Sequence, residues 1–263
     1  MIDYSFSFED LEFFLLIFVR IATFVFVAPF FSTSNTPRRV RAGFSLVLAY
    51  ILFQTLPEHN VPIYSTVLGY SILVLKEATA GLLIGLAANL CMSIVQFAGK
   101  VSDMEIGLSM VQLFDPLTKE ASGFMGNMYQ YILILIMLIT NLHYYFLRAI
   151  IETFSLIPIG GAVFDSDKIM TTMVTFLADY VLIAFRICLP IVAAMLLLNA
   201  ILGVLAKTAP QVNMFSVGIQ IKIIVGLGVL FLTIGTLPSA SEYVFDEMKV
   251  MVTAMVRSIS PGM

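Results

Sequence analysis

Charge is what this sequence has little of. Of its 263 residues, 14 are Lys or Arg and 17 are Asp or Glu, so charged residues make up 12% of the chain. This is about half the share of an ordinary globular domain. So few charges cannot cover a surface in water, which excludes a sizeable soluble domain. The net charge of −3 comes with no basic face, so nucleic-acid binding lacks the cations that phosphate contacts require.

Cysteine and histidine are also scarce, with two of each. Cys91 and Cys188 lie far apart inside apolar runs, with no paired spacing, and this predicts buried free thiols rather than a zinc site. His59 and His143 have no Ser, Asp or metal-ligand constellation around them in the sequence. We therefore predict that the protein is not an enzyme and that it holds no cofactor and no metal.

Long apolar runs are what the sequence does contain. Its hydrophobic fraction is 60%, its mean hydropathy is +0.99, and runs of about 20 residues recur, enough to cross a hydrocarbon core of roughly 30 Å. Such segments must satisfy their backbone groups internally, and these lack the alternation of barrel strands, so they are predicted to be helices. We predict an all-α integral membrane protein with about six long hydrophobic helices, some of them kinked or broken. The runs are residues 11–31, 40–56, 67–98, 128–151, 172–206 and 214–237.

Length and charge give a provisional topology. At 1.5 Å per residue, the runs 67–98 and 172–206 would extend about 48 and 52 Å, so each must project, tilt or break. Pro190 is the expected break point. Arginines 38, 39 and 41 predict a cytoplasmic loop between the first two runs. Alternation then places residues 99–127 inside and both termini outside, whereas a break at Pro190 that creates two spans would reverse the C-terminal tail.

Charges inside the runs need partners. Arg20 sits near the middle of the first run, where an arginine costs roughly 2.5–3.5 kcal/mol, so we expect it to face protein or water. A snorkelling side chain in a tilted helix is the alternative. Lys222 lies inside the last run and requires an acidic or carbonyl partner. Lys76–Glu77 and Arg186 adjoin charge-free stretches long enough to span, so they fit the membrane interface equally well.

Small residues predict close helix contacts. Gly81 and Gly85 form a GxxxG step, and Gly218, Gly226 and Gly228 lie in the last run. Such residues let helices approach closely in lipid. We therefore expect tight neighbours, including helices of other chains.

The segment of residues 99–127 combines acidic residues and glycines with an apolar patch at 106–114. A simple cytoplasmic linker would not need that patch. The pattern predicts a loop buried at membrane depth, which is tolerated where it lines or fills a cavity. An amphipathic interfacial helix is the alternative interpretation.

Several of these residues, taken with further motifs in the order in which they occur, resemble the sequence pattern of a known family. They are Lys76–Glu77 with Gly81 and Gly85, Ala98–Gly99 with Asp103 and Gly107, Phe114–Asp115–Pro116, then Asn199, Gly203, the run Ala-Pro-Gln-Val-Asn-Met-Phe at 209–215, Gly218 and Lys222. Over nearly its whole length the chain resembles the FliR family of flagellar biosynthetic proteins.

The resemblance implies a subunit of the flagellar type III protein export gate, in the bacterial inner membrane at the flagellar basal body. Such a subunit helps to form and seal the secretion pore for exported flagellar proteins. The implied partners are FliP-like and FliQ-like subunits, an FlhB-like subunit and membrane lipid. Residues 1–171 would correspond to a FliP-like helical part and residues 172–263 to a FliQ-like hairpin with a tail. The hairpin would turn in the cytoplasm at Lys207, Pro210, Gln211, Asn213 and Phe215.

The family further implies that residues 99–127 form a plug loop inside the pore. Its predicted plug residues are Met104, Ile106, Gly107, Leu108, Met110, Leu113, Phe114, Asp115 and Pro116. Methionine suits a deformable seal because its thioether chain adapts to irregular gaps. We expect glycines 99, 107, 123 and 126 to free the backbone at the loop ends, with Asp103 and Glu105 solvated. The residues predicted to be buried polar or assembly positions are Arg20, Lys76, Glu77, Gly81, Gly85, Asp103, Arg186, Asn199 and Lys222.

Two other functions remain open on the sequence. A homologous subunit of a virulence type III secretion system would share these motifs. A small secondary transporter would need broken helices and an ionisable midplane site, for which Arg20, Lys222 and Pro190 are the candidates. The resemblance also implies that helices can be raised out of the membrane against partner subunits, so an apolar run need not be a span.

Overall fold

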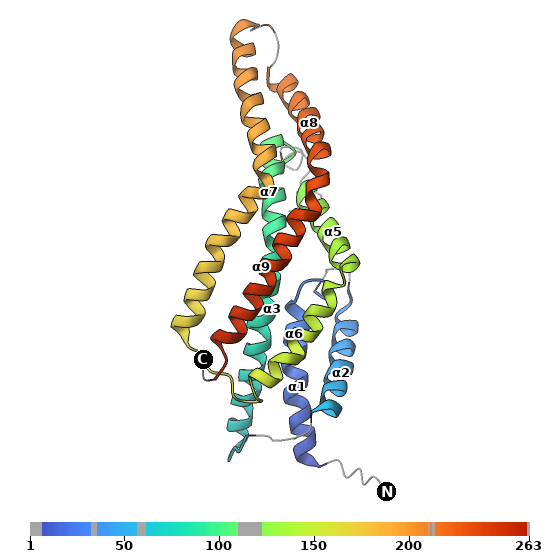
Figure 1. Ribbon diagram of the computed structural model, residues 1–263, viewed down its shortest axis with the longest axis vertical. Coiled ribbons are helices and arrows are strands. Elements are labelled where there is room, and N and C mark those ends of the chain that lie inside the picture. The colour runs from blue at the N-terminus through green and yellow to red at the C-terminus, as the bar shows by residue number, and fades with distance from the viewer. Residues whose placement is uncertain are drawn as a thin grey trace. The chain divides into compact units, whose positions relative to one another are not determined.

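The computed structural model describes residues 7–32, 36–56, 62–109, 123–209, 211 and 214–261, and its helices are labelled in Figure 1. The helices are α1 Phe8–Val27, α2 Arg38–Thr55, α3 Val67–Ile106, α5 Phe124–Ile139, α6 Leu142–Leu156, α7 Ser166–Thr208, α8 Met214–Thr233, a 3-10 turn η1 Ile234–Thr236, and α9 Leu237–Ser258. No strand occurs in this described part of the chain. The predicted all-α class is confirmed.

The long helices fit an all-α membrane protein. By length and composition, three helices could cross a membrane: Val67–Ile106, Ser166–Thr208 and Val217–Ser258. The bent pair α5 and α6 would make a fourth. Three or four of the described helical segments therefore qualify as candidate spans. The first two helices fall short because α1 carries Glu9, Asp10, Glu12 and Arg20, and α2 begins with arginines 38, 39 and 41.

Several predicted boundaries were wrong. The third helix continues to Ile106, so the first part of the predicted plug loop is helix. The run predicted at 128–151 is divided at residues 140–141, where α5 and α6 meet at a 75° bend. Asn141 has a left-handed backbone with φ 58°, which Asn adopts more readily than most residues.

Pro190 does not end its helix. α7 runs as one α-helix of 43 residues with Pro190 inside it. The residues after the last predicted run are not an irregular tail, because they form the 22-residue helix α9. That helix carries Glu242, Asp246, Glu247, Lys249 and Arg257 among its apolar residues, so its sequence does not form a further uninterrupted apolar run.

The described residues gather into two compact units. Unit 1 takes its residues from Met1–Leu90, Thr140–Phe176 and Glu247–Met263, and unit 2 takes its residues from Cys91–Ile139 and Leu177–Asp246. These spatial units cut across the sequence division at residue 171. That division rests on resemblance to partner families and stays a prediction.

In unit 1, α1 packs beside α2 (Figure 1). Ser7 starts α1 with a capping box, in which the Asp10 amide donates to the Ser7 hydroxyl at 3.2 Å and the Ser7 amide donates to the Asp10 carboxylate at 2.9 Å. This arrangement satisfies amides that a helix start leaves unpaired. Ile17, Ile21 and Phe24 follow at helical spacing and are fully buried, so they make the core face of α1.

Unit 2 has a core of its own. Ile106 from α3 and Met125 from α5 are buried there with Ile191 and Met195 from α7. Gly226 of α8 lies so close that an added Cβ would come within 2.7 Å of Ile106 Cγ1. The end of α3 is therefore a packed part of the fold.

Candidate functional site

A buried ion pair organises unit 1. Arg20 and Glu77 are both 0% exposed, and the arginine donates from Nε to Glu77 Oε2 at 2.5 Å and from Nη2 to Oε1 at 3.0 Å. This fork is the strongest geometry that an arginine and a carboxylate adopt. Arg20 therefore faces protein, as predicted, and the snorkelling alternative is wrong.

The rest of the guanidinium is also satisfied. Nη1 donates to the carbonyl of Ile157 at 3.0 Å and to that of Thr153 at 3.4 Å, and the guanidinium carbon lies 4.2 Å from the centre of the Phe154 ring. A cation over an aromatic face is favourable. Arg20 thus joins α1 to α3 and to the end of α6.

Glu77 and Lys76 reach the loop that follows α6. The amide of Gly160 donates to Glu77 Oε1 at 2.7 Å, and Lys76 Nζ donates to the carbonyl of Gly160 at 3.4 Å. Gly160 has φ 74°, and an added Cβ would come within 2.7 Å of Pro62 Cγ. Glycine is required here both by its backbone conformation and by the space.

The GxxxG step is a contact within this chain. A Cβ on Gly81 would collide with the carbonyl oxygen of Arg20 and with the Thr23 hydroxyl, and a Cβ on Gly85 would lie 3.0 Å from the carbonyl oxygen of Phe24. The two glycines therefore let α3 approach the backbone of α1. This approach brings Glu77, one turn away, within reach of Arg20.

The base of the predicted plug segment lies in unit 2. Asp103, near the end of α3, is 2% exposed, and both of its carboxylate oxygens accept from the amide of Met125 at 3.1 Å. Met125 is in the first turn of α5, where helix amides lack partners and negative charge is favoured. Asp103 therefore caps α5 and fastens the two ends of the segment between α3 and α5.

Glycines allow the ends of α3 and α5 to pack closely at this base. A Cβ on Gly99 would collide with the backbone of Gly126, and one on Gly123 would collide with the carboxylate of Asp103. The expectation that Asp103 is solvated, and that Gly99, Gly123 and Gly126 serve backbone freedom, was wrong, because all of them are in close contacts. Gly107 does use its freedom, since it ends α3 with φ 89°.

The structure divides the predicted plug residues into different environments. Met104 is 70% exposed on α3, Gly107 and Leu108 are half-buried, and Ile106 is fully buried in the core of unit 2. Ile106 is therefore a core residue, which corrects its assignment to a removable seal. Met110, Leu113, Phe114, Asp115 and Pro116 lie outside the described residues.

The remaining predicted polar residues belong to unit 2. Arg186 lines a cavity of about 330 Å³ beside Pro190 and Tyr243. Asn199 is exposed on α7, and Lys222 is half-buried on α8.

At the predicted turn, Lys207 and Gln211 are exposed, while Pro210, Asn213 and the Phe215 side chain lie outside the described residues.

Two interhelical hydrogen bonds were not predicted from the sequence. Gln96 Nε2 donates to Gln130 Oε1 at 2.6 Å, and the Tyr180 hydroxyl donates to the carbonyl of Ser93 at 3.0 Å. The signal available was a polar residue inside an apolar run, which in lipid marks a helix–helix hydrogen bond. Among the residues that the structure describes, no cluster of His, Cys, Asp or Glu could hold a metal ion.

Similarity to known proteins shows to which family this chain belongs. The sequence profile of the bacterial export proteins, family 1, matches residues 11–248. The chain belongs to this family. It is 33% identical to the flagellar biosynthetic protein FliR of Bacillus subtilis (strain 168), over 89% of this chain and 90% of that protein. It is 27% identical to the FliR protein of Buchnera aphidicola subsp. Baizongia pistaciae (strain Bp), over 97% and 100% of the two chains. It is 23% identical to that of Escherichia coli (strain K12), over 88% and 87%.

These matches place the chain in the flagellar type III protein export apparatus. The relatives are flagellar biosynthetic proteins, so a virulence secretion subunit and a secondary transporter are not favoured. In this chain, the buried ion pair and the capped base of the predicted plug segment are the features to be related to export.

Proposed function

We propose that this bacterial export protein is a multi-pass inner-membrane subunit of the flagellar export gate, and that it helps to form and seal the pore for flagellar proteins. Its role is structural, without catalysis or a cofactor. FliP-like and FliQ-like subunits and an FlhB-like subunit are its partners. Membership in the bacterial export family carries this proposal.

The capped base supports the sealing role. A conduit for an unfolded chain must stay closed to ions while idle, and its obstruction must return after each passage. Asp103 holds the start of α5 against the end of α3, so the segment between them is anchored at both ends. We propose that the segment of residues 99–127 seals the pore, with Met110, Leu113 and Phe114, which lie outside the described residues, among its predicted apolar plug residues.

Exposed apolar side chains support the partner role. On α7, Leu196 and Leu197 are 61% and 69% exposed, and on α8, Phe231 and Leu232 are 75% and 79% exposed. Large apolar side chains exposed in this way fit contact with lipid or with other subunits. The FliQ-like part, residues 172–263 with its hairpin and tail, would place these side chains against FliP-like and FliQ-like neighbours.

Co-purification tests the assembly. The chain is expressed alone and with its FliP-like and FliQ-like partners, and both preparations are compared by size-exclusion chromatography in detergent. We expect a polydisperse, protease-sensitive chain alone and a discrete complex with partners. A lone chain that is monodisperse and protease-resistant would contradict the proposal.

Ion leakage tests the seal. In the assembled complex, deletion of residues 107–115 is expected to make cells leaky to ions and small solutes, and Met110→Ala to give a milder leak because it thins the apolar surface. Conductance and solute-dependent growth inhibition are the readouts. A deletion that assembles normally and stays ion-tight would rule out the plug role.

Thiol labelling tests the topology. Cys91 and Cys188 are buried, so a new thiol from Ala209→Cys can be followed against a low background. We propose that this turn faces the cytoplasm, and we expect protection from an impermeant reagent added to spheroplasts. Prompt labelling before the cells are lysed would reverse the orientation.

A further inference from the structure

Arg186 of α7 is a charge without a partner in unit 2. The residue is exposed, and no residue that the structure describes forms a hydrogen bond or an ion pair with its guanidinium group. Arg20, which also lies inside an apolar run, is instead 0% exposed and forked onto Glu77. A charge inside an apolar stretch is costly in lipid unless an opposite charge meets it. Arg186 therefore needs an anion.

The described surroundings of Arg186 supply no such anion. The nearest acidic residue on its own helix is Asp179, which is about 10 Å away along the helix axis. The cavity of about 330 Å³ that Arg186 lines lies in unit 2, and its walls come from α5, α7, the end of α8, η1 and the start of α9. No carboxylate occurs among the described residues of these walls. The position is therefore open to an anion from another molecule.

The cavity offers hydrogen-bond donors beside the guanidinium group. Two of its threonines have used theirs, because Thr233 and Thr236 donate to backbone carbonyls of α8 at 3.0 and 2.7 Å. Ser239 and Tyr243 also line the cavity, and neither hydroxyl is hydrogen-bonded to a residue in the described ranges. Together with Arg186 they form a set of donors that fits a carboxylate, which carries negative charge and accepts several hydrogen bonds.

An apolar surface surrounds Arg186 along α7. Leu182, Phe185 and Leu189 are exposed, and their spacing of three or four residues places them on the same face as Arg186. Apart from Arg186, residues 181–198 contain no charge. Lipid headgroups lie at the ends of an apolar stretch, whereas here apolar side chains lie on both sides of the charge. The surface therefore fits an apolar helix better than a lipid headgroup.

A second copy of this chain does not fit the same face. Two copies that met through it would set one Arg186 against the other, and like charges that face each other across an interface are unfavourable. The occupant must differ from this chain and must carry the opposite charge.

We propose that this face of α7 binds a membrane helix of another export-gate subunit, and that an Asp or Glu within that helix enters the cavity and pairs with Arg186. Ser239 and Tyr243 donate to the same carboxylate, and the exposed apolar side chains of α7 pack against the rest of the helix. Charges inside a membrane are commonly neutralised by such pairing. The inference rests on the proposed function, because it requires partner subunits in the same membrane.

Assembly of the complex tests the pairing. The chain is co-expressed with its partner subunits, and the amount of complex recovered with it is measured after extraction in detergent. R186M keeps an unbranched side chain without the charge. We expect R186M to lower the recovery about tenfold or more, since one member of a buried charge pair is lost.

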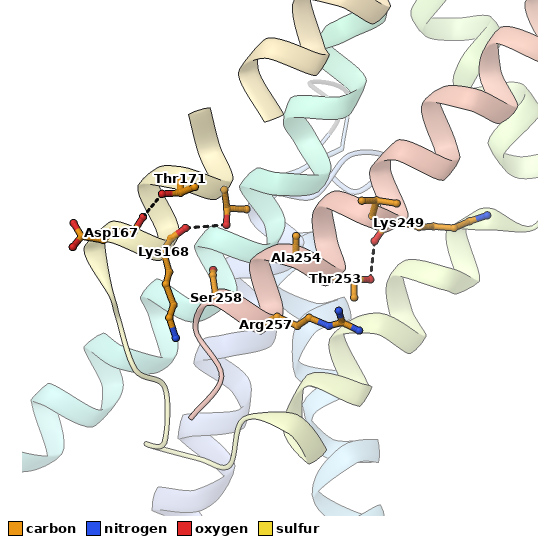
Figure 2. Close-up of a pocket in the computed structure, with 10 residues that line it drawn as sticks. Asp167, Lys168, Thr171, Lys249, Thr253, Ala254, Arg257 and Ser258 are labelled. Carbon is orange, nitrogen blue, oxygen red and sulfur yellow. Dashed lines mark hydrogen bonds between the residues drawn. The ribbon is translucent and has the colours of Figure 1, made fainter. Parts of the chain in front are cut away.

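A matched variant controls for the loss of one arginine. Arg257 is exposed on α9 and lines a different groove, in unit 1, which has the carboxylate of Asp167 in its own lining (Figure 2). R257M should therefore assemble as the wild type does. Equal recovery of the complex by R186M and R257M would overturn the proposal.

The chain without partners distinguishes an interface from an internal role. Because the described part of the chain gives Arg186 no partner, R186M should leave the lone chain as stable as the wild type or more stable. Thermal exposure of the buried thiols Cys91 and Cys188 to a reactive dye measures this. A lone R186M chain that melts well below the wild type would show an internal role and overturn the proposal.

An exchange of charges identifies the partner residue. R186E is combined with arginine substitutions in the partner subunits, in which each Asp or Glu of an apolar helix is replaced in turn. We expect one such combination to restore assembly, and this acid is the partner of Arg186. If no combination restores the complex, the ion pair is absent and the proposal is wrong.

Two further results separate the inference from its alternatives. If R186M assembles normally but retains less phosphatidylglycerol than the wild type in native mass spectrometry, a lipid phosphate meets Arg186 and the proposal is overturned. If the wild type itself recovers no partner subunit, the proposed function fails and the inference fails with it. Normal recovery by both the wild type and R186M refutes the inference and leaves the proposed function standing.

Discussion

Arg20 and Glu77 meet in the interior of unit 1 as a forked ion pair with neither side chain exposed. Burying two charges costs several kcal/mol per ion, and their attraction offsets this only with good geometry and full hydrogen bonding. Here the remaining donors and acceptors bind Ile157 and Gly160. The pair therefore specifies how α1, α3 and the end of α6 fit together.

Removing one partner of this pair should destabilise the protein severely. We expect Arg20→Met or Glu77→Met alone to cost about 3–5 kcal/mol, since each leaves an uncompensated buried charge, and the double variant to cost much less. Thermal exposure of the buried thiols Cys91 and Cys188 to a reactive dye measures the loss. Additive effects of the two substitutions would contradict the coupling.

The close approach at Gly81 predicts opposite results for two glycine substitutions. Gly81→Ala forces a methyl group into the backbone of α1 and should cost about 1–3 kcal/mol. Gly228→Ala is the matched control, because an added Cβ at Gly228 meets nothing within 4 Å, and it should stabilise the helix by up to about 1 kcal/mol. Melting temperatures in detergent distinguish them, and equal shifts would rule out the packing role of Gly81.

Loss of the cap at Asp103 should loosen the plug base. Asp103→Leu removes the acceptor for the Met125 amide and should destabilise the start of α5 by about 0.5–2 kcal/mol. In the assembled complex we expect an ion leak, measured as conductance. Glu105→Gln, a half-buried neighbour on α3, is the control and should stay tight. If the Asp103 variant conducts no more ions than the Glu105 control, the cap on α5 does not contribute to the seal.

Tyr64 predicts a pH dependence on the alkaline side. Its hydroxyl donates to the Glu12 carboxylate, and this hydrogen bond is the main cause that raises the pKa of Tyr64 to about 12. Because the pKa in the folded protein lies above the unfolded value of 10.0, the stabilisation is complete below pH 10. It is lost as the pH rises from 10 toward 12.

Tyr64→Phe provides the comparison. The difference in melting temperature between wild type and variant, followed by circular dichroism, should be constant up to about pH 10 and should shrink as the pH rises through the folded-state pKa of about 12. Absorbance titration of tyrosinate should lose one high-pH component in the variant. A difference that persists above that range would contradict this assignment.

Part of the structure follows from the sequence alone. The low charge and the long apolar runs predict an all-α membrane protein, since in lipid a helix satisfies the backbone hydrogen bonds within its own segment. The order of Lys76–Glu77, Gly81, Asp103 and the 209–215 run indicates the family. A central Arg20 predicts a buried partner, because its charge cannot be left in hydrocarbon.

The tertiary structure alone decided which groups meet. Glu77 lies 57 positions from Arg20, and Met125 lies 22 positions from Asp103. Hydropathy reports how a segment partitions into lipid, but it does not report which polar group a neighbouring helix supplies. The sequence therefore determined that Arg20 and Asp103 needed explanation, and only the packing of α1, α3 and α5 decided that one is an ion pair and the other a helix cap.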